Sequence, residues 1–285
     1  MSAVWSMVAS ALLFALMGVC VKLASGRMGT AEVVLLRGLL GALFTWGLAG
    51  VQRVDLRTTV PQLHLRRGLA GGVALALWFS ALAGLPVATA MTLNYLSSIW
   101  LAVFLVGMAW TGRRGPVSRR LLGAVLLGFG GVVLVLRPSV EQQQWRPALA
   151  GLLSGLAAAA AYRQIVALGR AGEPQARVVF YFSLTGAAVG AVWLPFTSEP
   201  WVWPDLPGWA LLLGVAGFAT AAQLFLTHAY AVGKTLVNAS LHYLGIAFAF
   251  LFGVTMFGDP VIASSLVGMG LIVAAGLLAV RAQGR

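Results

Sequence analysis

Apolar runs of about 20 residues, separated by short polar joints, dominate this chain. A helix of that length crosses the hydrocarbon core of a bilayer. Irregular backbone cannot face lipid, so the joints must lie at the membrane surfaces. We therefore predict an all-α integral membrane protein with ten transmembrane helices, at about Ala3–Ala24, Thr30–Gly50, Arg67–Gly84, Val87–Trp110, Arg120–Leu136, Arg146–Leu168, Pro174–Leu194, Pro207–Tyr230, Thr235–Phe257 and Val261–Val280.

Two stretches of the chain, Trp78–Trp100 and Leu226–Phe248, resemble each other weakly. Each joins two apolar runs through a short turn, which in the first stretch is Gly84-Leu85-Pro86-Val87, and Asn94-Tyr95-Leu96 aligns with His242-Tyr243-Leu244. Five predicted spans precede Glu141 and five follow it, so the second copy enters the membrane from the opposite side. The pattern predicts two inverted five-helix repeats, residues 1–140 and 141–285, in one compact membrane domain.

The fifth and tenth spans carry glycines at similar spacings. Gly123 and Gly130-Gly131 in the fifth span resemble Gly268 and Gly276 in the tenth. Small residues seven apart return to nearly the same helix face, as close helix packing requires. We interpret these two spans as packing helices that do not line a site.

Basic residues gather in alternate joints and predict the orientation. One side carries most of them: Arg53, Arg57, Arg66, Arg67, Arg113, Arg114, Arg119, Arg120, Arg170, Arg177, Lys234, Arg281 and Arg285. The Lys/Arg bias places this side and both termini in the cytoplasm, and predicts a multi-pass protein of a bacterial-type inner membrane. The composition, 60% hydrophobic and 9% charged, agrees. Topology accounts for the net charge of +12 better than nucleic-acid binding does.

Polar and aromatic side chains share faces of otherwise apolar spans. Met91, Asn94, Tyr95 and Ser98 lie at i, i+3, i+4 and i+7, and Asn238 and His242 lie at i and i+4. Such faces predict a cavity near the middle of the membrane. In it, aromatic rings would enclose the apolar part of a solute and polar side chains would bind its polar ends. The candidate substrate-binding residues are Trp78, Asn94, Tyr95, Ser98, Trp100, Tyr162, His228, Asn238, His242 and Tyr243. The alternative for each is an interhelical hydrogen bond or simple packing.

Charged and reactive groups inside the spans are few. For Arg37 we expect a structural partner, either Glu32 or a backbone carbonyl, rather than a substrate contact. No carboxylate falls in the middle of a span, which leaves His228 and His242 as the titrating candidates there. The sequence has no nucleophile elbow or zinc-protease motif, and Gly233-Lys234-Thr235 lacks the rest of a phosphate-binding loop. We expect no enzymatic activity, no cofactor and no metal.

Ten spans in two halves, the short turn before the fourth span and the paired glycine-rich helices resemble the drug/metabolite transporter superfamily, in its EamA branch. The Trp-, Tyr- and Met-rich faces are most similar to YddG-type inner-membrane exporters of aromatic and other neutral amino acids. The resemblance implies a basket of ten helices around a central cavity lined by spans one, three, four, six, eight and nine. It supports Trp78, Asn94, Tyr95, Trp100, Tyr162, His242 and Tyr243 as lining residues, whereas His228 and Asn238 come from helix spacing alone.

The sequence therefore favours a secondary transporter that exports neutral or aromatic amino acids, or related small metabolites, by alternating access. Its partners would be that solute and the lipid bilayer, with no nucleic acid and an oligomeric state that the sequence leaves open. Three alternatives remain: another cargo such as a drug or nucleotide sugar, a passive channel, and a membrane enzyme or assembly subunit. Phosphorylated cargo is disfavoured because Arg37 and Arg163 are the only intramembrane cations that the pattern shows.

Overall fold

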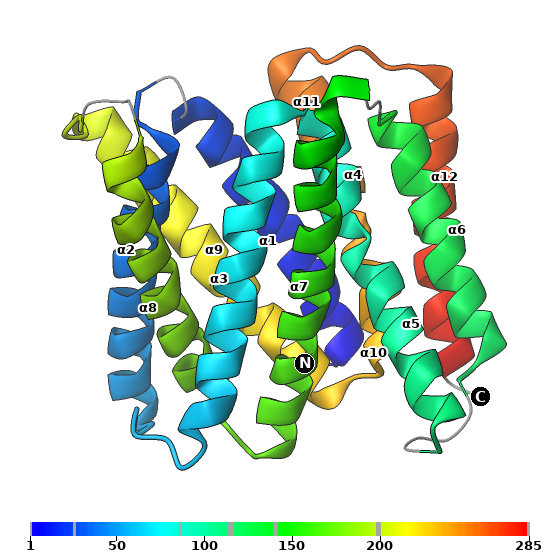
Figure 1. Cartoon of the computed structure of the whole chain (residues 1–285), viewed down its shortest axis with the longest axis horizontal. Helices are drawn as coiled ribbons and strands as arrows, with labels where there is room; N and C mark the ends of the chain where they lie inside the picture. Colours follow the sequence, from blue (N-terminus) through cyan, green and yellow to red (C-terminus); the bar gives the residue numbers. More distant parts are fainter. Residues whose placement is uncertain are drawn as a thin grey trace.

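The computed structural model describes residues 2–24, 27–85, 87–112, 117–138, 142–197 and 201–283, and every regular element within them is helical. Several residues that entered the sequence predictions lie outside these ranges: Pro86, Arg113, Arg114, Glu141 and Arg285. Both termini lie toward the lower end of the molecule in Figure 1.

The described chain forms long helices joined by short segments (Figure 1). They are α1 (Ala3–Ala24), α2 (Thr30–Gln52), α3 (Pro61–Gly84), α4 (Val87–Tyr95), α5 (Ser97–Trp110), α6 (Arg119–Leu136), α7 (Trp145–Arg170), α8 (Gln175–Trp193), α9 (Leu206–Val232), α10 (Thr235–His242), α11 (Leu244–Phe257) and α12 (Ala263–Gln283). Short 3₁₀ turns at Gln142–Gln144 and Leu194–Phe196 precede α7 and follow α8. Within the described residues, 9 segments are long and apolar enough to cross a membrane. The remaining predicted span corresponds to α3.

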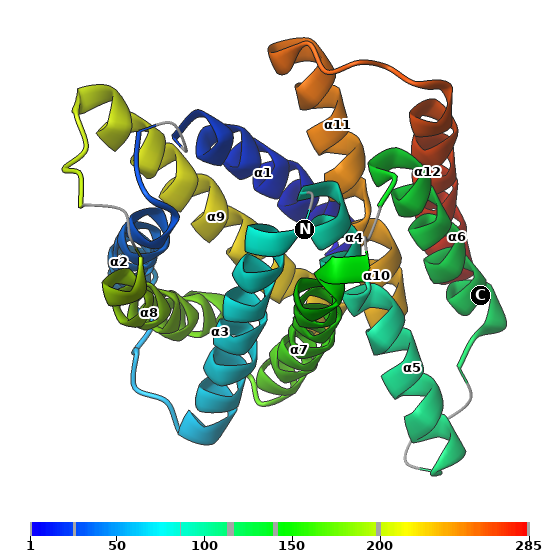
Figure 2. The same cartoon turned by 45° about the horizontal axis from the view of Figure 1, so that its top comes forward.

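Helices that are far apart in sequence pack in pairs. The most extensive contacts join α1 to α9, α2 to α8, α3 to α7 and α6 to α12. In Figures 1 and 2 the α2–α8 pair stands at one edge of the molecule and the α6–α12 pair at the other, with the remaining helices between them. Each of these pairs joins a helix of the first half of the chain to a helix of the second half.

Two predicted spans are interrupted rather than continuous. The fourth span breaks at Leu96, between α4 and α5, and the ninth breaks at Tyr243, between α10 and α11. Each break is a tight turn: the Leu96 amide donates to the Leu93 carbonyl at 3.3 Å, and the Tyr243 amide donates to the Ser240 carbonyl at 3.4 Å. Glycine and proline are absent from both breaks. The two breaks fall within one residue of each other in the sequence alignment of the halves.

The third span starts earlier than predicted, and this corrects the place of Arg67. Helix α3 begins at Pro61, so Arg67 lies about two turns inside it rather than in the preceding joint. The side chain is only 4% exposed, whereas its neighbour Arg66 is exposed. The guanidinium of Arg67 lies 3.8 Å from the centre of the Phe182 ring on α8, and this contact accompanies its burial.

Helices α6 and α12 pack through glycines. A Cβ added at Gly131 would lie 2.5 Å from the Gly268 carbonyl oxygen, and one added at Gly268 would lie 2.6 Å from the Gly131 carbonyl oxygen. The two backbones are therefore in direct contact, and any side chain at either position would push the helices apart. The glycine spacing in the sequence predicted such close packing.

Candidate functional site

Five aromatic rings, four of them on helices and one at the break between α10 and α11, meet where the two interrupted spans break. The Tyr95 ring centre lies 5.2 Å from that of His242 and 6.2 Å from that of Tyr243. Tyr162 stacks on Tyr230 at 5.2 Å and approaches His242 edge-on at 5.7 Å. We call Tyr95, Tyr162, Tyr230, His242 and Tyr243 the aromatic cluster. It joins α4 of the first half to α7, α9 and α10 of the second.

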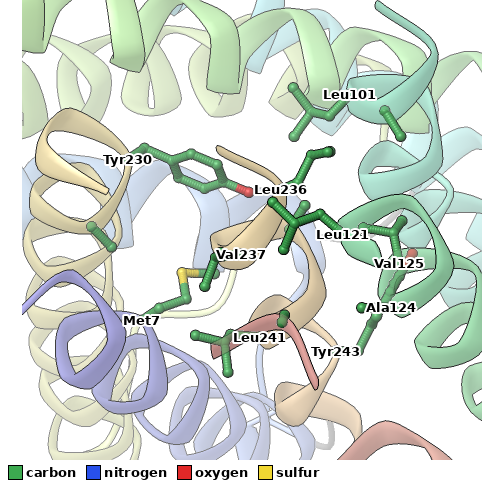
Figure 3. Packing of buried hydrophobic residues seen from close by; sticks show 14 of the residues in the cluster. Met7, Leu101, Leu121, Ala124, Val125, Tyr230, Leu236, Val237, Leu241 and Tyr243 are labelled. Atoms are coloured by element: carbon green, nitrogen blue, oxygen red, sulfur yellow. The ribbon is translucent and has the colours of Figure 1, made fainter. Parts of the chain in front are cut away.

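The helix breaks help to place these rings. Tyr95 is the last residue of α4, and His242 is the last of α10, so each ring projects from a helix end. Close packing of α7 supports the first break, because a Cβ at Gly155 would meet the Leu93 carbonyl oxygen at 2.7 Å. Figure 3 shows Tyr230 reaching from α9 toward Leu236 on α10, among buried apolar side chains.

Several polar atoms near the cluster are buried without a hydrogen-bond partner among the described residues. They include the Tyr230 hydroxyl, His242 Nδ1 and Trp100 Nε1. Trp100 on α5 packs against the same core. An unpaired buried donor or acceptor typically costs about 1–3 kcal/mol. The aromatic cluster is therefore a buried, mainly apolar region with several polar atoms that a partly apolar solute could pair with.

Three predicted site residues use their polar atoms in contacts between or beside helices. Asn94 Nδ2 donates to Ser154 Oγ on α7 at 3.2 Å, and the Ser98 hydroxyl donates to the Ala239 carbonyl at 2.9 Å. Asn238 Nδ2 donates to the Ala229 carbonyl at 2.5 Å, across the α9–α10 turn. These bonds agree with the alternative interpretation of each residue, which was a hydrogen bond between helices rather than a contact with substrate. A substrate-binding role for them stays a prediction.

Two other predicted residues, His228 and Trp78, are not among the five rings that define the aromatic cluster. His228 on α9 is half-buried, and its Nδ1 lies 3.3 Å from Gln175 Nε2 at the start of α8. Trp78 is half-buried on α3. Tyr230 shared the helix spacing of polar residues on its span but was not among the predicted binding residues, although its stacking on Tyr162 makes it part of the cluster.

A second polar region lies between α2, α3, α8 and α9. A cavity of about 20 Å³ is lined by Arg37, Gly38, Phe182, Ser183, Gly186, Ala219, Thr220 and Gln223. Gln223 Oε1 accepts a hydrogen bond from Arg67 Nη2 at 3.4 Å. The expected pairing of Arg37 with Glu32 is wrong. The Glu32 carboxylate instead accepts from the Val202 and Gly29 amides, at 2.9 and 3.3 Å.

A charged cluster closes one end of the α2, α3, α7 and α8 group. The Glu173 carboxylate in the α7–α8 joint accepts hydrogen bonds from Thr58 Oγ1 at 2.9 Å and from Arg177 Nη1 at 3.1 Å, and lies 2.9 Å from His64 Nε2. Burial acts to raise the pKa of Glu173, but the bonds from His64, Thr58 and Arg177 outweigh it and lower this pKa below its ordinary value. The Tyr181 hydroxyl donates to the Leu56 carbonyl at 3.0 Å and its ring packs on His64. We call Thr58, His64, Glu173, Arg177 and Tyr181 the Glu173 cluster.

Known proteins resemble this chain over most of its length. The pseudopaline exporter of Pseudomonas aeruginosa is 31% identical over 92% of this chain and 90% of its own. An S-adenosylmethionine uptake transporter of Rickettsia felis is 24% identical over 80% of this chain and 74% of its own. A crystal structure with 20% sequence identity superposes with a TM-score of 0.84 over 99% of both chains, which shows a shared fold.

These relatives are transporters rather than enzymes, and the helices described above account for a protein that crosses the membrane several times. The EamA-like transporter family also matches residues 1–137 of the chain. The long relative at 31% identity extends the relationship to the second half. The chain therefore belongs to the EamA-like transporter family, within the drug/metabolite transporter superfamily.

Proposed function

We propose that this protein is an inner-membrane secondary transporter that exports neutral or aromatic amino acids, or small metabolites derived from them, by alternating access. The aromatic cluster is the binding site for the apolar part of the cargo. The observation that carries the proposal is the meeting of five rings at two helix breaks, with buried polar atoms that have no partner among the described residues. Interrupted helices at the midplane are a common way to build a transporter site.

The helix pairing supports two inverted repeats as the basis of this mechanism. Exchanging the halves replaces α1 by α7, α2 by α8, α3 by α9 and α6 by α12. Under this exchange the α1–α9 pair becomes the α7–α3 pair, while α2–α8 and α6–α12 are each converted into themselves. The breaks at Leu96 and Tyr243 also exchange, within one residue. A pseudo-two-fold relation of this kind would let one half rock against the other around a fixed site.

The chemistry of the aromatic cluster favours an aromatic or partly apolar cargo. Stacked and edge-on rings 5.2–5.7 Å apart offer faces and edges to another ring. Tyr230 and His242 add polar atoms that could orient it. One relative is named for S-adenosylmethionine, a molecule that contains an amino-acid group, and this supports cargo of the same broad class.

Flux measurements in proteoliposomes test the proposal. Tyr95→Ala and His242→Ala should lower L-phenylalanine counterflow at least about tenfold, which corresponds to the loss of roughly 1.4 kcal/mol of binding. Trp110→Ala is the matched control, because Trp110 is 88% exposed and lies far along α5 from the break. It should keep wild-type flux. Wild-type flux in both site variants would remove the aromatic cluster from the pathway, and non-saturable flux without counterflow would indicate a channel.

A further inference from the structure

We propose that Arg37, Arg67 and Gln223, which we call the arginine site, bind a carboxylate group of the transported solute. The inference rests on the proposed transport function and adds the part of the cargo that the aromatic cluster does not recognise.

The two arginines enter the bundle from opposite ends. Arg37 lies seven residues after the start of α2, and Arg67 lies six residues after the start of the next helix, α3. At 1.5 Å per residue each is about 10 Å inside its helix. Consecutive spans run in opposite directions, so the two side chains reach the interior from the two faces of the membrane. A cation at that depth is costly unless it is paired or lines a pathway for water or solute.

Arg37 and Arg67 share two neighbours, Gln223 and Phe182. Arg67 hydrogen-bonds Gln223 Oε1 at 3.4 Å and lies 3.8 Å over the Phe182 ring. Gln223 and Phe182 also line the cavity beside Arg37. The hydroxyl-bearing residues Ser183 and Thr220 line the same space. This set is rich in donors, which is the arrangement that a carboxylate requires.

The positive charges lack compensation within the described part of the chain. Neither Arg37 nor Arg67 lies within 4.0 Å of a described carboxylate. The buried carboxylate of Glu173, which lies just before α8, already contacts His64 and Arg177. Arg67 is only 4% exposed, and its Nε atom has no hydrogen-bond partner among the described residues. An acceptor supplied by the solute would complete this set.

The arginine site and the aromatic cluster share one face of α9. Gln223 of the arginine site lies seven residues before Tyr230 of the aromatic cluster, so the two are about 10 Å apart along the helix. The cavity of about 20 Å³ has room for a water-sized group, so a carboxylate oxygen fits but a whole solute requires the helices to separate. An amino acid placed with its carboxylate at the arginines would direct its side chain toward the tyrosines.

Small probes test the arginine site without knowledge of the cargo. The thermal unfolding of the purified full-length protein in detergent would be measured against acetate and against acetamide, its neutral analogue, at constant ionic strength. Acetate should raise the apparent Tm and acetamide should not. Arg37→Gln and Arg67→Gln should raise the acetate concentration needed for the same rise in Tm at least about tenfold, as expected for the loss of a charge-assisted hydrogen bond.

Arg66→Gln is the matched control, since Arg66 is the exposed neighbour on the same helix and loses the same charge. It should keep the wild-type response to acetate. An equal response to acetate and acetamide, no response in the wild type, or an equal loss in Arg66→Gln would each overturn the proposal.

Gln223→Glu keeps the test decisive if an arginine variant fails to fold. This change has nearly the same shape and places a carboxylate between the two arginines. It should raise the Tm without acetate and abolish the acetate response. A fall in Tm with an intact acetate response would instead mean that Gln223 has only a structural role and would contradict the site.

The two proposals can fail separately. If acetate binds as expected but L-phenylalanine shows no counterflow, the arginine site stands and the amino-acid cargo is wrong. If L-phenylalanine is transported and its decarboxylated analogue phenethylamine competes equally well, the cargo class stands and the arginine site is wrong.

Discussion

The aromatic cluster and the Glu173 cluster are both buried contacts between the two halves of the chain, but they differ in how their polar groups are satisfied. In the Glu173 cluster one carboxylate is held by three side chains, at 2.9–3.1 Å. In the aromatic cluster the Tyr230 hydroxyl and His242 Nδ1 have no partner among the described residues. A satisfied network fixes geometry, whereas unsatisfied polar groups in an apolar setting are available to a ligand.

The largest effect on stability should come from neutralising the carboxylate of the Glu173 cluster. Glu173→Gln leaves Arg177 without its counter-charge and removes the carboxylate beside His64. It should lower the free energy of unfolding by about 2 kcal/mol, somewhat less than for a fully buried pair because the Arg177 side chain is 14% exposed. The apparent Tm in detergent measures this. Arg27→Gln is the control: it breaks the half-exposed Arg27–Asp205 pair and should cost less than about 1 kcal/mol. Equal losses in the two variants would mean that the Glu173 cluster is no more than a surface pair.

Acid should remove the same contribution gradually. The folded-state pKa of Glu173 is lower than its ordinary value, so the stabilisation is complete above the unfolded pKa, about 4.3, and is lost as the pH falls through the lower folded pKa. The difference in Tm between the wild type and Glu173→Gln should therefore be constant from pH 7 to about 5 and shrink below about 4.3. A difference that persists unchanged to lower pH would show that the carboxylate is not the stabilising group.

The smallest effect on stability is expected when one tyrosine hydroxyl is removed from the Glu173 cluster or from the aromatic cluster. Tyr181→Phe removes the bond to the Leu56 carbonyl and should cost about 1 kcal/mol of stability with flux unchanged. Tyr230→Phe removes a buried hydroxyl that has no described partner, so stability should stay equal or rise slightly while flux falls several-fold. Parallel Tm and counterflow measurements separate the two. The reverse pattern would exchange the roles that we assign to the two regions.

The sequence predicted the helices well because each span is an apolar run of membrane length. It did not predict the breaks at Leu96 and Tyr243, because neither break residue is glycine or proline. Helix α7 packs closely at the first break, through Gly155 against the Leu93 carbonyl, and Gly128 approaches the Tyr243 ring at the second. Arg67 was placed in a joint because an arginine near an apolar run normally marks the membrane surface. Its burial depends on Phe182 and Gln223, which are distant in sequence.

The aromatic residues of the candidate site could be predicted from sequence, since a tyrosine or histidine inside an apolar run stands out. Tyr95, Tyr162, His242 and Tyr243 were predicted together, and the structure brings their rings within reach of one another. The amide and hydroxyl groups of Asn94 and Ser98 were harder to interpret. Helix spacing identifies which face a polar group occupies but not whether a neighbouring helix already satisfies it.

The α2–α8 pair is fastened at its two extremities. At one extremity the Glu32 carboxylate on α2 accepts from the Val202 amide in the segment that leads into α9, and at the other Thr58 and His64 are held by Glu173 just before α8. Contacts at both ends restrain α2 and α8 from moving relative to each other. A solute that enters the arginine site must then separate α9 from this pair, and the two spans that are divided at mid-length can take part in that motion.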